Sequence, residues 1–154
     1  MTFFETLLRE TAGERDELIR TRQIQDGLRG QISRDTYIAY LAEAYHHVKH
    51  TAPLMEAAKD ALRPHQLWMA PALDEYIEEE RGHEMWILED IAAAGGNAEA
   101  VRKGAPRPAT EFMVSYIYDY VTRINPAGLF GMVFVLEGTS IELSTCTWAS
   151  TSPG

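Results

Sequence analysis

The 154-residue chain has one cysteine, Cys146, and few positive charges. A single cysteine cannot form a disulfide within the chain, which is typical of proteins in a reducing compartment. Fourteen lysines and arginines stand against 23 aspartates and glutamates, and the formal net charge is −9. This balance lacks the clustered positive charge with which proteins bind nucleic acids or anionic membranes. We therefore expect small molecules or other proteins as partners.

Long apolar runs and several catalytic motifs are also missing. The longest apolar run is well short of the roughly 20 residues that a membrane-spanning helix needs. The first residues, MTFFETLLRE, include acidic side chains and lack the basic segment that begins a signal peptide. The chain has no glycine-rich phosphate loop, no Cys-x-x-Cys and no Gly-x-Ser-x-Gly. These absences predict a cytoplasmic protein and disfavour nucleotide-binding, thiol-redox and serine-hydrolase chemistry.

The sequence does contain apolar residues at helical spacing, with almost no alternation of the kind that predicts strands. It predicts an all-α helical bundle, and the length suits one ordinary domain. We expect residues 1–143 to form this domain and the Ser- and Thr-rich residues 144–154 to form an irregular tail. The five predicted helices cover approximately residues 2–29, 34–61, 66–94, 111–124 and 127–143. The third helix should stop at Gly95 and Gly96, because glycine favours a helix C-terminus.

One carboxylate lies within the most apolar segment of the chain. Residues 128–143, GLFGMVFVLEGTSIEL, include Glu137. On a helix, Glu137 shares a face with Val133, Phe134 and Ile141. Burying a lone carboxylate costs several kcal/mol or more, so Glu137 must be paired, protonated or bound to a ligand.

A second inward-facing carboxylate occurs in the third predicted helix, LDEYIEEERGHEMWILEDI. Glu80 falls in the middle of the apolar arc of this helix, and His83 lies at its edge. The arc consists of Leu73, Tyr76, Ile77, Ile87, Leu88 and Ile91. Helical bundles that hold two iron or manganese ions use this Glu-x-x-His spacing. In the alternative interpretation, Glu80 pairs with an arginine and His83 is a half-buried core histidine. Glu80 and Glu137 would repel each other unless a proton or a cation lay between them, and a metal explains both most simply.

The second predicted helix carries a stripe of polar residues in the segment EAYHHVKHT. Glu43, His46, His47 and His50 fall within an arc of roughly 100°. This stripe borders the apolar arc of the helix rather than lying within it. A solvated or pocket-lining face is therefore at least as good an interpretation as a set of metal ligands.

Three segments resemble successive helices of the haem-oxygenase-like di-iron oxidases. They are YLAEAYHHVKHTAPLM, EEERGHEMWILEDIAAAGG and NPAGLFGMVFVLEGTS, and their order is the specific part of the resemblance. This family is also called iron-containing redox enzymes and is related to thiaminase II and the PQQ-synthesis protein C. The resemblance covers about residues 35–142 and implies a seven-helix fold, with about five of the helices present here. It also implies iron held by Glu80, His83 and Glu137, and oxygen activation on small carboxylic or amino acids.

The chain departs from the family after the Leu-Glu-Gly segment. The family continues with further helices and takes more ligands from a His-x-x-x-Asp-x-x-His motif, whereas this chain has no histidine after His83 and ends in STCTWASTSPG. That ending resembles a truncation. The resemblance then implies an iron site that a histidine stripe or a partner chain must complete. It also implies an apolar groove that a second copy would cover, and we expect a homodimer or larger homo-oligomer.

Two relatives of the family are weaker guides to function. Haem oxygenase needs an early proximal histidine, and the first histidine here is His46. Thiaminase II depends on a cysteine in the core, whereas Cys146 lies in the predicted tail.

Three functions remain open. The first is a non-haem iron oxidase or oxygenase acting on a small metabolite. The second is a metal-free relative in cofactor metabolism, with Glu80 and Glu137 as catalytic acid and base. The third is a non-catalytic helical module that dimerises. The missing His-x-x-x-Asp-x-x-His motif favours this third function. The presence of Glu80, His83 and Glu137 favours the first function, the iron oxidase or oxygenase. In the first function, the substrate or cofactor cavity would be lined by Tyr45, His46, His47 and His50.

Overall fold

The computed structural model describes residues 1–136, and the secondary structure of this part of the chain is helical, with no strand. This confirms the predicted all-α class. The chain divides into two compact units. Among the described residues, one comprises Ser33–Phe130, and the other comprises Met1–Ile32 together with residues 131–136. No helix within residues 1–136 is long and apolar enough to cross a membrane.

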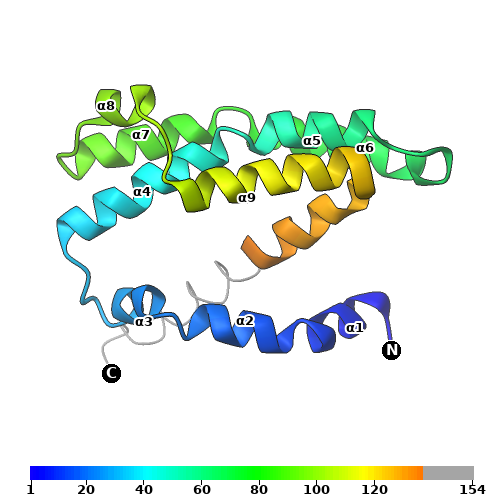
Figure 1. Ribbon diagram of the computed structural model, residues 1–154, viewed down its shortest axis with the longest axis horizontal. Coiled ribbons are helices and arrows are strands. Elements are labelled where there is room, and N and C mark those ends of the chain that lie inside the picture. The colour runs from blue at the N-terminus through cyan, green and yellow to red at the C-terminus, as the bar shows by residue number, and fades with distance from the viewer. Residues whose placement is uncertain (137–154) are drawn as a thin grey trace. The chain divides into compact units, whose positions relative to one another are not determined.

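In the larger unit, α4 packs against α7 and α5 packs against α6, while α9 packs against both α4 and α5 (Figure 1). Its elements are α4 (Arg34–Val48), α5 (Thr51–Asp60), the 3-10 helix η1 (Pro64–Met69), α6 (Ala70–Glu80), α7 (His83–Ala93), α8 (Ala98–Lys103), α9 (Pro108–Asp119), the π-helical turn η2 (Tyr120–Ile124) and the 3-10 helix η3 (Pro126–Gly128).

The helix predicted over residues 34–61 is interrupted, and the continuous prediction is wrong there. α4 ends at Val48, and α5 begins at Thr51 after a two-residue turn. Pro53 accounts for the break, because proline has no N–H to donate to the carbonyl four residues earlier and its ring clashes with that carbonyl. The turn places His50 at the N-terminal end of α5 rather than within one long helix.

The helix predicted over residues 66–94 is also interrupted. Gly82 has φ +89°, a left-handed conformation, and the preceding Arg81 is extended. A regular helix cannot pass through a left-handed residue, so α6 ends at Glu80 and α7 starts at His83. Apolar residues keep their helical spacing across this break, which is why the pattern predicted one helix.

The end of α7 at two glycines is confirmed. Gly95 has φ +76°. Its N–H donates to the carbonyl of Ala92 at 2.8 Å, and the N–H of Gly96 donates to that of Ile91 at 2.8 Å. These two bonds form the Schellman arrangement, which satisfies carbonyls at the helix end. The Nε of Arg34, at the start of α4, donates to the carbonyl of Ala94 and ties this end to the neighbouring helix.

The core of the larger unit follows the predicted apolar arc. Leu73 and Ile77 of α6 are buried, and so are Leu88 and Ile91 of α7. The side chains of Leu88 and Ile91 form one cluster with two residues of α4, Leu41 and Tyr45.

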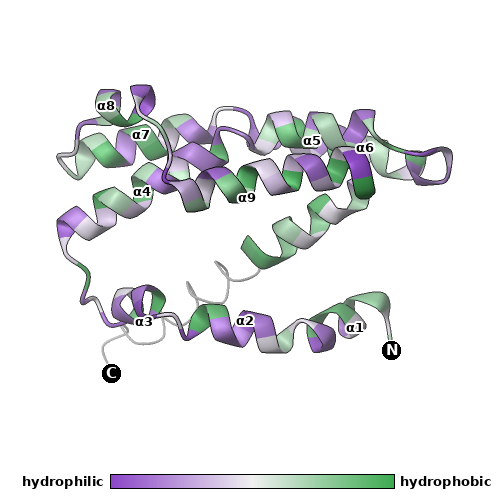
Figure 2. Ribbon diagram, viewed as in Figure 1, coloured by the Kyte–Doolittle hydropathy of each residue, from purple (hydrophilic) through white to green (hydrophobic). Residues whose placement is uncertain are grey.

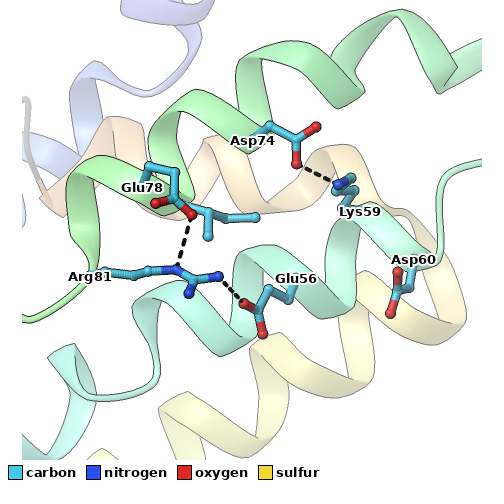
Figure 3. A pocket seen from close by; sticks show the side chains of 7 residues that line it. Glu56, Lys59, Asp60, Asp74, Glu78 and Arg81 are labelled. Atoms are coloured by element: carbon cyan, nitrogen blue, oxygen red, sulfur yellow. Dashed lines mark hydrogen bonds and ion pairs between the residues drawn. The ribbon is translucent and has the colours of Figure 1, made fainter.

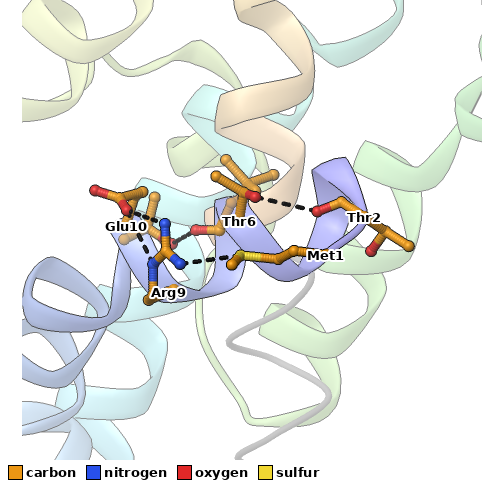
Figure 4. Close-up of polar contacts among 7 residues, drawn as sticks. Met1, Thr2, Thr6, Arg9 and Glu10 are labelled. Carbon is orange, nitrogen blue, oxygen red and sulfur yellow. Dashed lines mark hydrogen bonds and ion pairs between the residues drawn. The ribbon is translucent and has the colours of Figure 1, made fainter.

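The smaller unit contains α1 (Phe3–Glu10), α2 (Ala12–Ile19) and α3 (Arg22–Leu28), where one helix over residues 2–29 was predicted. Thr2 caps α1: its side chain accepts from the N–H of Glu5, whose carboxylate accepts from the N–H of Thr2. Thr6 donates to the carbonyl of Thr2, and Arg9 pairs with Glu10 (Figure 4). Thr11 favours the interruption between α1 and α2, because its hydroxyl donates to the carbonyl of Leu7.

Pairs of apolar and polar residues follow one another along α1 (Figure 2), so the helix has an apolar side. None of the described residues in this unit is buried, however. The ring of Phe4 lies edge-on to that of Phe134, with centroids 6.1 Å apart. The guanidinium of Arg15 lies over the Phe134 ring at 5.7 Å. These contacts join the N-terminal helices to residues 131–136 within the unit.

The last predicted helices are partly observed. The helix predicted over 111–124 begins earlier, at Pro108, and ends in the π-helical turn η2. Residues 129–136 are helical, in agreement with the helix predicted from 127. The rest of that helix, Glu137 and the predicted tail at 144–154 lie outside the described residues. Because predicted helices are interrupted, residues 1–136 contain more and shorter helices than the five expected.

The break at Gly82 yields a test of the fold. We expect Gly82→Ala to lower the free energy of unfolding by about 1–2 kcal/mol, because an L-residue resists the left-handed conformation. No atom lies within 4 Å of the added Cβ, so the effect is conformational. Urea denaturation measures it.

Gly13→Ala is the matched control, because Gly13 lies inside α2 and its Cβ would also meet nothing within 4 Å. There alanine should stabilise by about 0.5–1 kcal/mol. A stabilising Gly82→Ala would instead show that residues 81 and 82 are helical in solution.

Candidate metal centre

Glu80 and His83 lie together across the helix break. Glu80 is the last residue of α6 and His83 the first of α7. The distance between Glu80 Oε2 and His83 Nδ1 is 3.1 Å. The two side chains are 17% and 29% exposed, respectively, so the pair is half-buried. The predicted proximity of carboxylate and imidazole is therefore present, although no single continuous helix carries both.

The alternative in which Glu80 pairs with an arginine is not what the structure shows. The adjacent Arg81 turns to other carboxylates, with its Nη2 3.0 Å from Glu56 and its Nε 3.3 Å from Glu78. In the described part of the chain, the Glu80 carboxylate is hydrogen-bonded to His83.

Trp86 also contacts His83, and this contact was not predicted from the sequence. Its ring stacks on the imidazole with centroids 4.2 Å apart and an interplanar angle of 29°. The spacing of three residues within α7 was the available signal, because residues at i and i+3 lie on one helix face.

The hydrogen bond between Glu80 and His83 leaves lone pairs on both side chains that could bind a cation. A neutral imidazole has one N–H. When the Nδ1–H of His83 donates to Glu80, the Nε2 lone pair stays available, and the carboxylate keeps further lone pairs. Within residues 1–136, no group of three or more His, Cys, Asp or Glu side chains could hold a metal ion. The third predicted ligand, Glu137, lies outside the described residues.

His46 lies deeper than predicted. It is 3% exposed, so the expectation that the histidine stripe only borders the core is wrong at this position. Its Nδ1 is 3.3 Å from the Nζ of Lys49, and its ring lies edge-on to Tyr45 at 5.4 Å. Tyr45 itself belongs to the α4–α7 core cluster. The packing of other helices onto α4 widens its buried face beyond the arc that the α4 sequence predicts.

Two further residues of the stripe, Glu43 and His50, contact α9 or its N-cap. The Nδ1 of His50 is 3.4 Å from the hydroxyl of Tyr118, and their rings are nearly perpendicular at 5.8 Å. Glu43 accepts hydrogen bonds from the hydroxyl of Thr110 at 2.5 Å and from the N–H of Arg107 at 3.1 Å. Glu43 therefore joins α4 to the start of α9. The polar contact of Tyr118 was not predicted from the sequence.

Burial sets the protonation of this histidine group. Burial lowers the pKa values of His46, His47 and His50, and the nearby charge of Lys49 lowers those of His46 and His50 further. Burial also raises the pKa of Tyr118, with a contribution from Glu56. Uncharged imidazoles and a phenol are thus favoured, and these groups can form hydrogen bonds without a net charge.

A cavity of approximately 510 Å³ lies between α5 and α6 (Figure 3). Lys59 pairs with Asp74 there, and Arg81 bridges the two carboxylates already described. Glu80 and His83 are not among the lining residues, so this cavity is separate from the candidate metal centre. Its lining residues are Glu56, Lys59, Asp60, Asp74, Ile77, Glu78 and Arg81.

The fold of the chain is similar to that of a crystal structure from Shewanella denitrificans OS217, which is described as a domain of unknown function with a haem oxygenase-like fold. The TM-score is 0.81 and the sequence identity 24%. The match covers 97% of this chain and 66% of that one, so this chain spans just under two thirds of the similar protein. The fold is therefore haem oxygenase-like, as the resemblance implied.

Residues 38–148 match the family described as iron-containing redox enzyme, and the chain belongs to this family. The matched range contains Glu80, His83 and Glu137. No curated protein matches the chain. The family prediction made from the three segments is confirmed.

The buried His46 and the half-buried His47 and His50 predict a pH dependence of stability. Their pKa values are lower in the folded chain than the ordinary 6.5, so the unfolded chain binds more protons below that pH. Their stabilising contribution is complete above about pH 6.5 and is lost as the pH falls, by up to about 1.4 kcal/mol per pH unit for each histidine. Urea unfolding at pH 7.5 and 5.5 measures the loss.

His46→Gln should reduce this pH-dependent loss. His65→Gln is the control and should leave it unchanged, because His65 is exposed. An equal loss in wild type and His46→Gln would contradict the assignment.

Proposed function

We propose that the protein is a non-haem iron-dependent oxidase or oxygenase that acts on a small metabolite. In this proposal Glu80, His83 and Glu137 hold the iron. The half-buried Glu80–His83 pair carries the proposal, since it lies within the part of the chain that matches a family of iron-containing redox enzymes. Iron bound there would supply the ability to bind and activate dioxygen.

The chemistry of the described residues fits iron. Imidazole nitrogen is a suitable iron ligand, and carboxylates accompany histidine in non-haem iron sites. The Oε2 atom of Glu80 and the Nδ1 atom of His83 lie 3.1 Å apart, close enough for one cation to take the place of the proton that they share. Glu80 and His83 would then be neighbouring ligands of the same ion. Glu137 enters the proposal through the resemblance and its position in the matched range.

The protein's own residues would prepare the site for the reaction. Leu73 and Ile77 are buried along α6 and help exclude water from the side of Glu80. His46, His50 and Tyr118 are proposed to hold the substrate by hydrogen bonds. Burial and the favoured neutral forms support this role, because such groups can bind a polar substrate without placing a charge beside it. Tyr45 and His47 belong to the same proposed lining, and the resemblance implies a small carboxylic or amino acid as substrate.

Iron content tests the proposal. Wild type loaded anaerobically with Fe(II) should retain about one or two iron ions per chain after desalting, as measured by mass spectrometry. His83→Ala and Glu137→Gln should each lose this iron because each removes a proposed ligand. His65→Ala, which removes an exposed histidine, should keep it.

Wild-type iron content in both ligand variants would contradict the proposed site. Absence of iron from wild type would favour the metal-free or non-catalytic functions. Glu137→Leu separates those two: a non-catalytic module should gain or keep stability, since an unpaired buried carboxylate is only a cost. The homodimer stays a prediction.

A further inference from the structure

His83 is held on two sides by groups of different character. Glu80 lies 3.1 Å from Nδ1 at the edge of the imidazole, while Trp86 stacks on its face at 4.2 Å and 29°. A hydrogen bond at one ring nitrogen fixes the direction of that edge but leaves the ring able to pivot about the bond. A stacked ring fixes the plane. The two contacts together therefore define one orientation of the imidazole.

The exposure of Trp86 indicates that it is not an ordinary core residue. The residue is 61% exposed, whereas Leu88 and Ile91 supply the buried face of α7. Tryptophan is large and mostly apolar, and its burial is what normally stabilises a fold. Here most of that surface stays in solvent while one face of the indole covers His83. The stacking is thus separate from the packing that holds α7 on α4.

We propose that Trp86 is a positioning residue for His83, whose stacked indole holds the imidazole plane so that its metal-binding nitrogen points in one direction. This inference rests on the proposed function, because it takes His83 as a metal ligand. Groups that orient a metal-binding histidine commonly change metal affinity 10–100-fold when they are removed. Trp86 would play this part by stacking on the ring.

Co(II) binding tests the proposal, because Co(II) accepts the same nitrogen and oxygen ligands as Fe(II). The affinity of the full chain for Co(II) is measured by titration calorimetry. Trp86→Leu should bind Co(II) about 10–100-fold more weakly than wild type. Trp86→Phe retains a ring that can stack and should recover most of the affinity. Trp68→Leu is the matched control, because Trp68 is 78% exposed on η1, and it should bind like wild type.

A second measurement needs no metal. The ring current of a stacked indole shifts the His83 ring protons upfield in the NMR spectrum. We expect this shift in wild type, Trp86→Phe and Trp68→Leu, and its loss in Trp86→Leu. Circular dichroism establishes that each variant retains its helices, and the Phe variant provides the test if the Leu variant does not fold.

The outcomes separate this inference from the proposed function. If Trp86→Leu binds Co(II) as tightly as wild type while His83→Ala binds weakly, Trp86 is not a positioning residue and the metal site stands. A folded Trp86→Phe that binds as weakly as His83→Ala also overturns positioning by stacking. If His83→Ala binds as tightly as wild type, or if wild type binds no Co(II), the proposed metal site fails and the role of Trp86 fails with it.

Discussion

The packing of α4 against α7 holds together the part of the protein that carries the chemistry. Leu41 and Tyr45 meet Leu88 and Ile91 in one buried cluster. Gly96 permits a close approach at the end of this contact, since a Cβ there would lie 3.0 Å from Ile38 of α4. The Glu80–His83 pair lies at the start of α7, and the histidine stripe lies on α4. Both polar groups therefore depend on the same apolar contact for their positions.

The polar candidates gather at interruptions of helices. Glu80 and His83 lie on either side of the left-handed Gly82, and His50 lies at the turn that Pro53 requires. At a helix end the backbone changes direction, and a side chain there is less constrained by the repeat of the helix than one in its middle. The carboxylate of α6 can then meet the imidazole of α7, even though the backbone between them is not helical.

The two polar groups offer different chemistry. The Glu80–His83 pair joins a carboxylate to an imidazole and retains lone pairs that suit a cation. His46 is buried beside Lys49, and the half-buried His50, at the start of α5, lies beside the hydroxyl of Tyr118; neutral forms of both histidines are favoured. The proposed function would use the first group to hold a metal and the second to form uncharged hydrogen bonds with a polar substrate.

The sequence by itself determined the helical class, the family and the buried face of the third predicted helix, including Leu73, Ile77 and Leu88. Apolar spacing carries this information because it reflects which side of a helix faces the core. Periodicity could not reveal the break at Gly82, since the apolar spacing continues across it. Only the tertiary structure decided that His46 is buried and that Tyr118 meets His50, because both depend on how other helices pack around α4 and the start of α5. The stacking of Trp86 on His83 likewise required the side-chain conformations, since helical spacing brings two residues near each other without fixing the angle between their rings.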